Sequence, residues 1–135
     1  MVSLKYIIIP ISVAILAQII KTIIEIIKTK KINLLRLLDG MGGMPSVHSS
    51  LVSSLTTLIY LNYNISSVMF SITLIFSLIV IYDSMGIRYE SGSHAKVLNK
   101  CLGTNLNEKL GHKPIEVLIG VLLGIILTIL LNKII

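Results

Sequence analysis

The stretch Gly40-Met41-Gly42-Gly43-Met44-Pro45-Ser46-Val47-His48-Ser49-Ser50 interrupts an apolar chain and then opens a new apolar segment. Its glycines let the backbone approach a ligand closely, and a helix start carries unpaired N–H groups with a partial positive charge. This combination suits an anion, and His48 beside it can carry a proton near neutral pH. The same residues also fit a simple turn between helices, with Pro45 early in the helix and Ser46 as its cap.

The composition around this stretch is that of a membrane protein. Of the 135 residues, 54% are hydrophobic and 13% are charged, and the mean hydropathy is +0.92. A small soluble domain cannot bury so much apolar surface, so we expect a single membrane-embedded domain over residues 1–135. The apolar N-terminal run continues to about Ile27, which is too long for a signal peptide and indicates an uncleaved span. The one cysteine, Cys101, excludes an internal disulfide and a cysteine-based metal cluster.

Four apolar segments predict an all-α bundle of about four transmembrane helices. They cover residues 4–27, 47–61, 66–82 and 114–131. The second is short and rich in serine and threonine, which favours a place inside the bundle. The polar segment 90–109 has the pattern of a cytoplasmic amphipathic helix on or under the bundle. Its periodic apolar residues are Val97, Leu98, Cys101, Leu102 and Leu106.

The basic residues predict the orientation. Most of them lie in the two long connections, and only Lys5 and Lys133 mark the opposite side. Basic connections stay in the cytoplasm, so we expect a multi-pass protein of the cell membrane with both termini outside. The net charge of +6 is not interleaved with aromatic residues, which favours anionic lipid as a partner and excludes nucleic acid. A homo-oligomer is compatible with 14.8 kDa and is not required by it.

Polar residues recur at helical spacing along the first span. Gln18, Lys21, Glu25 and Lys28 form one stripe. A charge at the depth of Lys21 is costly unless it faces a polar interior. Two interpretations stay open: Lys21 pairs with Glu25 four residues on, or it faces a substrate.

The last span begins with a histidine and a carboxylate. His112 and Glu116 are four residues apart, so the carboxylate can accept the Nδ1–H and leave Nε2 as a nucleophile. Gly120 and Gly124 extend the same line, which predicts tight packing of this face against another helix. At the end of the third span, Asp83 and Arg88 are expected to pair.

Two histidines, several cations and a glycine-rich helix start suit phosphoryl transfer. In that reaction charge is held in place, one group attacks phosphorus and another protonates the leaving oxygen. The collected polar residues are Lys21, Arg36, Ser46, His48, Asp83, Arg88, His112 and Glu116.

These motifs resemble a known superfamily. Pro-Ser-Val-His at 45–48 resembles the Pro-Ser-Gly-His motif of the type-2 phosphatidic acid phosphatases and vanadium haloperoxidases. Gly-His-x-Pro-x-Glu-Val at 111–117, with its two following glycines, resembles their closing motif. Arg-x-x-x-Gly-x-His at 88–94 has the spacing that normally precedes it, so this motif looks split by the amphipathic segment. The whole layout is similar to the small, divergent membrane branch of the superfamily.

The resemblance implies a reduced phosphatase-like core without metal or cofactor, acting on a lipid phosphate or pyrophosphate. It implies that His112 attacks phosphorus, that Glu116 orients it and that His48 protonates the leaving group. The residues that it implies at the phosphate site are Lys21, Arg36, Ser46, Val47, Asp83 and Arg88.

Three hypotheses follow. The first is a phosphatase that works through a phosphohistidine, and the second is a phosphate- or lipid-headgroup-binding protein without turnover. Val47 favours the second, because it replaces a glycine that lets the backbone close on phosphate. The third is a small transport or assembly subunit. His94 competes with His112 as nucleophile, although it has Leu98 where a carboxylate is needed.

Overall fold

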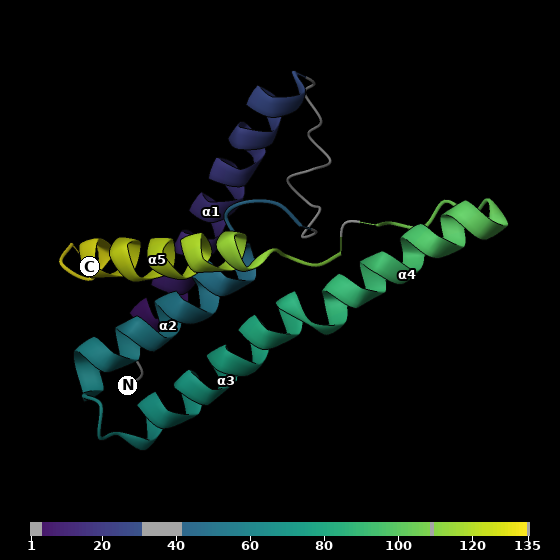
Figure 1. Ribbon diagram of the computed structural model, residues 1–135. Helices are drawn as coiled ribbons and strands as arrows, with labels where there is room; N and C mark the ends of the chain where they lie inside the picture. The colour runs from purple at the N-terminus through teal and green to yellow at the C-terminus, as the bar shows by residue number, and fades with distance from the viewer. Residues whose placement is uncertain (1–3, 31–41, 109, 135) are drawn as a thin grey trace.

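The computed structural model describes residues 4–30, 42–108 and 110–134 (Figure 1). These residues form five helices and no strand, which confirms the predicted all-α fold. The helices are α1 (Lys5–Thr29), α2 (Val47–Tyr63), α3 (Val68–Met85), α4 (Ile87–Leu102) and α5 (Pro114–Leu131).

Three helical stretches in the described ranges are long and apolar enough to cross a bilayer. They are α1, α5 and the run Val68–Leu102 that joins α3 to α4. The second predicted span, which corresponds to α2, has 17 residues and is not among them. Its serines and threonines lower its hydropathy, and Asn64 ends it with a positive φ of 71°. The protein is therefore an α-helical membrane protein with a short polar helix among its apolar ones.

The short helix α2 is the centre of the bundle, because it packs against α1, α3 and α5. Its small hydroxyl side chains face the neighbouring helices, where they find partners. The Ser54 hydroxyl bonds that of Thr128 on α5, and the Thr56 hydroxyl bonds that of Ser77 on α3 at 2.7 Å. Small hydroxyl residues let helices approach closely while keeping every polar atom satisfied. The predicted inside position of this helix is confirmed.

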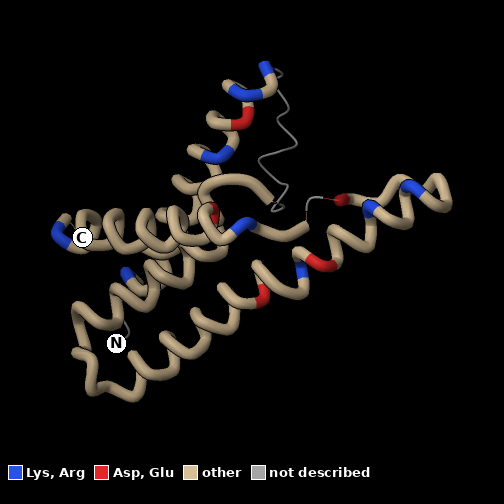
Figure 2. Tube along the Cα trace, viewed as in Figure 1, with Lys and Arg blue, Asp and Glu red and all other residues tan. Residues whose placement is uncertain are grey.

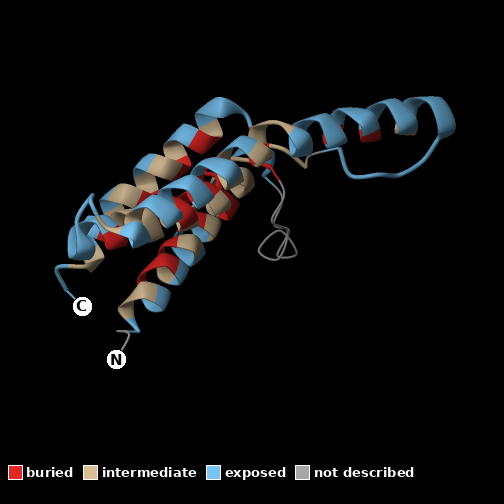
Figure 3. Cartoon of the chain, turned by 90° about the horizontal axis from the view of Figure 1, so that it is seen from below, coloured by how far each residue is buried: buried red, intermediate tan, exposed pale blue. Residues whose placement is uncertain are grey.

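Two glycines of α5 make the contact with α2 unusually close. A Cβ atom on Gly120 would lie 2.5 Å from the Ser46 carbonyl oxygen, and one on Gly124 would lie 2.5 Å from that of Ser50. Real side chains do not tolerate such distances, so only glycine fits at both positions. The predicted tight packing of this face is confirmed, and the buried residues of α5 are Val117, Gly120, Gly124 and Thr128. Most buried residues of the described chain lie within the bundle (Figure 3).

Polar side chains join three helices at the end of the bundle that carries both termini. Lys5 Nζ donates to Asn62 Oδ1 at 2.7 Å and to Asn132 Oδ1 at 3.4 Å. The rings of Tyr6 and Tyr63 lie 5.7 Å apart beside it. Both termini therefore lie at one end of the bundle (Figure 3).

The helix α4 continues beyond the bundle and contacts no helix of the described ranges other than α3 (Figure 3). The expectation that it lies on or under the bundle is wrong. Its buried residues are Gly92 and Ala95, whereas the apolar residues Val97 and Leu102 are exposed. The returning chain packs on the small residues instead: a Cβ on Gly92 would lie 2.5 Å from the Glu108 carbonyl oxygen. We call α4 and residues 103–108 the arm.

Candidate functional site

The glycine turn leads directly into α2. Gly42 and Gly43 have positive φ values of 32° and 98°, a region that favours glycine. Ser46 caps the helix by accepting a bond from the Ser49 N–H, at 3.4 Å, on its Oγ. Pro45 precedes the cap and is not part of the helix, contrary to the expected early helical position. The Ser46 N–H donates to the Glu116 carbonyl oxygen at 3.0 Å, which joins the turn to the start of α5.

The predicted histidine and carboxylate lie in contact just before and within α5. His112 Nδ1 is 3.2 Å from Glu116 Oε2, and the imidazole is only 3% exposed. The Lys113 N–H donates to the same carboxylate oxygen at 3.1 Å. The His112 backbone N–H donates to the Ser84 carbonyl oxygen of α3 at 3.0 Å. Thus α3 holds the backbone of His112, and Glu116 of α5 holds its ring.

The surroundings of His112 favour the neutral imidazole. Burial lowers the pKa of His112 below its ordinary value, and the positive charge of Lys21 lowers it further. The Glu116 carboxylate opposes this shift through its hydrogen bond and charge, and so does a hydrogen bond between the ring and the Gly43 backbone. A neutral ring has one nitrogen lone pair, as a nucleophile requires.

The second histidine, His48, lies half-buried in the first turn of α2. The ionisable groups near it are Arg88, His112 and Lys21. These four residues come from α1, α2, the start of α4 and the segment before α5. The fold thus gathers at one end of α2 the groups that the sequence only suggested as a set.

Arg88 also pairs with Asp83, as predicted. Its Nε lies 2.7 Å from Asp83 Oδ2, and the two side chains are 44% and 33% exposed. A guanidinium carries five N–H donors in a fixed fork, so one such bond does not use its capacity for an anion. Asp83 contacts Arg88 directly, so its proposed place at the phosphate site is through this cation.

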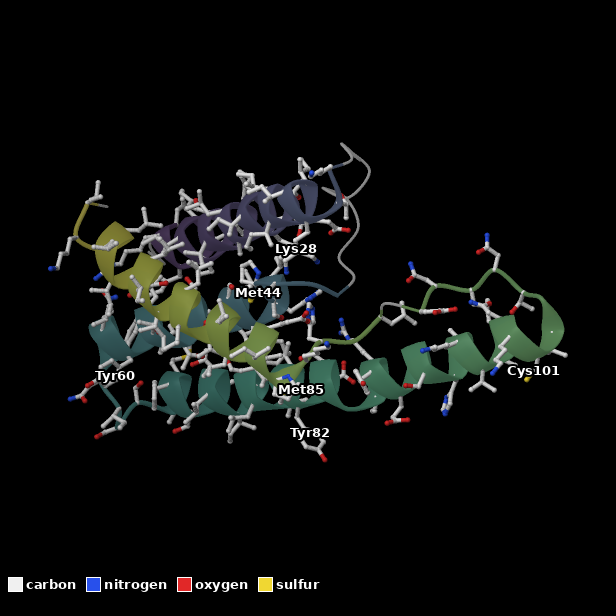
Figure 4. All side chains as sticks on the ribbon, turned by 45° about the horizontal axis from the view of Figure 1, so that its top comes forward. Lys28, Met44, Tyr60, Tyr82, Met85 and Cys101 are labelled. Carbon is white, nitrogen blue, oxygen red and sulfur yellow. The ribbon has the colours of Figure 1, made fainter. Side chains whose placement is uncertain are left out.

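A pocket of about 530 Å³ opens beside these residues. One wall is the C-terminal half of α1, the other is the arm, and the glycine turn lies between them. In Figure 4, Lys28 on α1 and Met44 in the glycine turn lie on this side of the bundle. The charged residues that line the pocket are Lys21, Glu25, Lys28, Lys96, Glu108, Lys113 and Glu116.

Residues 2–127 match the family described as the divergent PAP2 family. The chain belongs to this family. The chain is similar to the uncharacterized membrane protein YuiD of Bacillus subtilis (strain 168). The two are 34% identical over 78% of this chain and 80% of the relative's length. No solved structure matches the chain. The resemblance inferred from the motifs is confirmed.

The other predicted residues of this divergent PAP2 chain have different positions. Lys21 is 2% exposed and lines the pocket, and Val47 begins α2, where backbone N–H groups have no partner within the helix. Arg36 lies outside the described residues. His94 is exposed on the arm and has Leu98 four residues on, so it lacks the oriented and buried setting of His112.

Sequence reasoning missed the outer wall of the pocket. Tyr89, Ser93 and Lys96 line it from α4, and Glu108 lines it from the returning chain. The first three are four and three residues apart, so they share one helical face, and the sequence alone could have shown this spacing. Glu108 has no such signal, because its place depends on how the chain turns back after α4.

Proposed function

We propose that this chain is a membrane phosphatase that hydrolyses a lipid phosphate or pyrophosphate through a phosphohistidine on His112. The observation that supports it best is the buried contact between His112 and Glu116, with the glycine turn and Lys21 beside it. A neutral, oriented imidazole next to cations and a helix start is the arrangement that attack on a phosphate needs.

In the first step, Nε2 of His112 attacks phosphorus while Nδ1–H is held by Glu116. The bond between phosphorus and the leaving oxygen breaks, and His48 gives that oxygen its proton. Lys21 and Arg88 balance the negative charge on the phosphate oxygens, together with the N–H groups at the start of α2.

In the second step, water attacks the same phosphorus and the bond to His112 breaks. His48, which lost its proton in the first step, accepts one from the water, so inorganic phosphate leaves and both histidines return to their starting states. A histidine that first gives and then takes a proton suits a site at neutral pH.

The test is phosphate release by the purified protein in detergent. Polyprenyl pyrophosphate and phosphatidate serve as substrates, and vanadate serves as inhibitor. We expect His112→Ala to lower turnover by about 10³-fold or more, because it removes the nucleophile. His94→Ala is the matched control and is expected to keep wild-type turnover. Equal inactivity of wild type and His112→Ala across both substrates would refute the enzyme.

Two observations favour a second candidate, a phosphate- or headgroup-binding protein without turnover. Val47 carries a side chain where the resembling motif has glycine, and the ring of His112 already bonds the Gly43 backbone. This candidate predicts that vanadate raises the unfolding temperature by mass action while no phosphate is released from any substrate. Phosphate release that His112→Ala abolishes would refute it.

We also propose the cell membrane as location, with the arm in the cytoplasm. Basic residues gather on the arm and at the end of α1, whereas the end that carries the termini shows few (Figure 2). Cys101 is the one cysteine of the chain and is exposed near the tip of the arm (Figure 4). An impermeant maleimide should label it in permeabilised but not in intact spheroplasts. Equal labelling in both would reverse the orientation.

A further inference from the structure

The Asn99 side chain makes four hydrogen bonds within the arm. The Asn99 amide nitrogen donates to the Leu106 carbonyl oxygen at 2.8 Å and to Glu108 Oε1 at 2.9 Å. Its oxygen accepts bonds from the Leu106 N–H and from the Thr104 hydroxyl, both at 2.8 Å. These four bonds fold the chain back along α4 and fix the carboxylate of Glu108.

The pocket beside the arm is larger than a phosphate needs. Sites of 300–1,000 Å³ typically hold a ligand of drug size, and this pocket has about 530 Å³. We take its inner end to be where the buried Lys21 and Glu116, the partner of His112, line it, and we place the proposed reaction there. The remaining space, between α1 and the arm, is available to the part of the substrate that carries the phosphate.

The lining of that outer space is polar and of mixed charge. Lys28 and Glu25 face it from α1, and Lys96 and Glu108 face it from the arm. A purely cationic wall would suit a second phosphate, and an apolar wall would suit an acyl chain. Ammonium donors beside carboxylate acceptors suit hydroxyl groups, because a hydroxyl both donates and accepts.

We propose that Asn99 is a positioning residue for substrate recognition, and that the wall it sets selects a hydroxyl-bearing phosphate ester. This inference rests on the proposed function, because it takes the phosphate to bind at the inner end of the pocket. Asn99 fixes Glu108 directly, and by folding the return chain onto α4 it sets the distance between Glu108 and Lys96. It touches neither the phosphate nor His112.

The inner end has its own supports, so the two parts are separable. His112 is held by the Ser84 carbonyl and by Glu116, and the glycine turn is held by the bond from Ser46 to the Glu116 backbone. None of these bonds involves Asn99. Loss of the Asn99 amide should therefore disturb hydroxyl recognition and leave phosphonate binding intact.

The experiment compares two phosphonates that resist hydrolysis and differ only in two hydroxyl groups, butylphosphonate and 3,4-dihydroxybutylphosphonate. Their dissociation constants are measured calorimetrically on the full chain in nanodiscs. For wild type we expect the dihydroxy compound to bind about tenfold more tightly, the factor typical of a hydrogen bond to a charged group. A monoacyl version with one hydroxyl left shows whether the ligand comes from a lipid or from solution.

Asn99→Ala should bring the ratio of the two constants close to one while the constant for butylphosphonate stays the same. Asn99→Asp keeps the two accepted bonds and should give an intermediate ratio. Lys96→Gln alters the wall directly, so it serves if Asn99→Ala fails to fold, and it should also lower the ratio. Asn105→Ala is the matched control, because this exposed asparagine of the same turn does not line the pocket.

The outcomes separate this inference from the proposed function. A wild-type ratio of one, or a tenfold ratio that survives in Asn99→Ala, would overturn the role of Asn99 and leave the phosphate site standing. A parallel loss of affinity for both compounds in Asn99→Ala would show a merely structural role and would overturn it too. No binding of either phosphonate to wild type would overturn both the inference and the phosphate site.

Discussion

The bundle around α2 and the arm are stabilised by different kinds of contact. In α2 the buried residues include four serines, whose hydroxyls bond their own helix and its neighbours. The arm buries only Gly92 and Ala95 within α4, and Asn99 bonds its return chain. Many small contacts hold the first region, and a few polar bonds hold the second. The groups proposed for chemistry lie on the first, and those proposed for selection lie on the second.

The largest effect is expected where α5 meets α2. Gly124→Leu places a side chain against the Ser50 backbone and the Ser53 hydroxyl, so we expect the free energy of unfolding to fall by about 3 kcal/mol. Denaturation by sodium dodecyl sulfate in mixed micelles, followed by circular dichroism, measures it. Leu118→Ala alters an exposed position of the same helix and serves as control. If both variants unfold at the same detergent fraction, the close packing does not stabilise the bundle.

A smaller effect is expected from the protonation of His112. Its pKa is lower in the folded chain than in the unfolded chain, mainly because it is buried, so the unfolded state binds more protons as the pH falls below about 6.5. Stability is therefore complete above that pH and is lost as the pH falls toward the folded pKa, with a slope of at most about 1.4 kcal/mol per unit. His112→Gln should flatten this part of the curve between pH 7 and 5. An unchanged slope would mean that other groups cause the acid sensitivity.

The bundle could be predicted from the sequence because its signals are local. Ser46 and Pro114 mark helix starts, the apolar runs give their lengths, and the line from Glu116 to Gly124 shows which face packs. The pairing of His112 with Glu116 follows from a spacing of four, which the helix turns into contact.

The arm could not be predicted in the same way. The amphipathic pattern of α4 indicates that one face is more apolar than the other. It does not indicate which segment of the chain packs on either face. The structure buries Gly92 because the backbone of Glu108 approaches it, and it leaves Val97 exposed. The position of Glu108 depends on the turn that Asn99 makes, and no periodic signal in the sequence specifies that turn.

The smallest effect is expected at the junction of the two regions. Asp83 ends the bundle and Arg88 begins the arm, and both side chains are partly exposed. An exposed ion pair contributes roughly 0.5 kcal/mol, so Asp83→Asn should change the free energy of unfolding very little. A double-mutant cycle of Asp83→Asn and Arg88→Gln measures the coupling. A coupling energy above about 2 kcal/mol would show that the pair joins bundle and arm into one cooperative unit.

The length of α2 has a consequence for how a substrate reaches the site. At about 1.5 Å per residue its 17 residues span roughly 25 Å, which is less than the hydrocarbon thickness of about 30 Å. Lys5 and Asn62 bond at its far end and His48 lies in its first turn, so α2 cannot hold both groups at headgroup level in a bilayer of that thickness. A lipid phosphate would thus meet the histidines after a short descent within its own leaflet, without leaving the membrane.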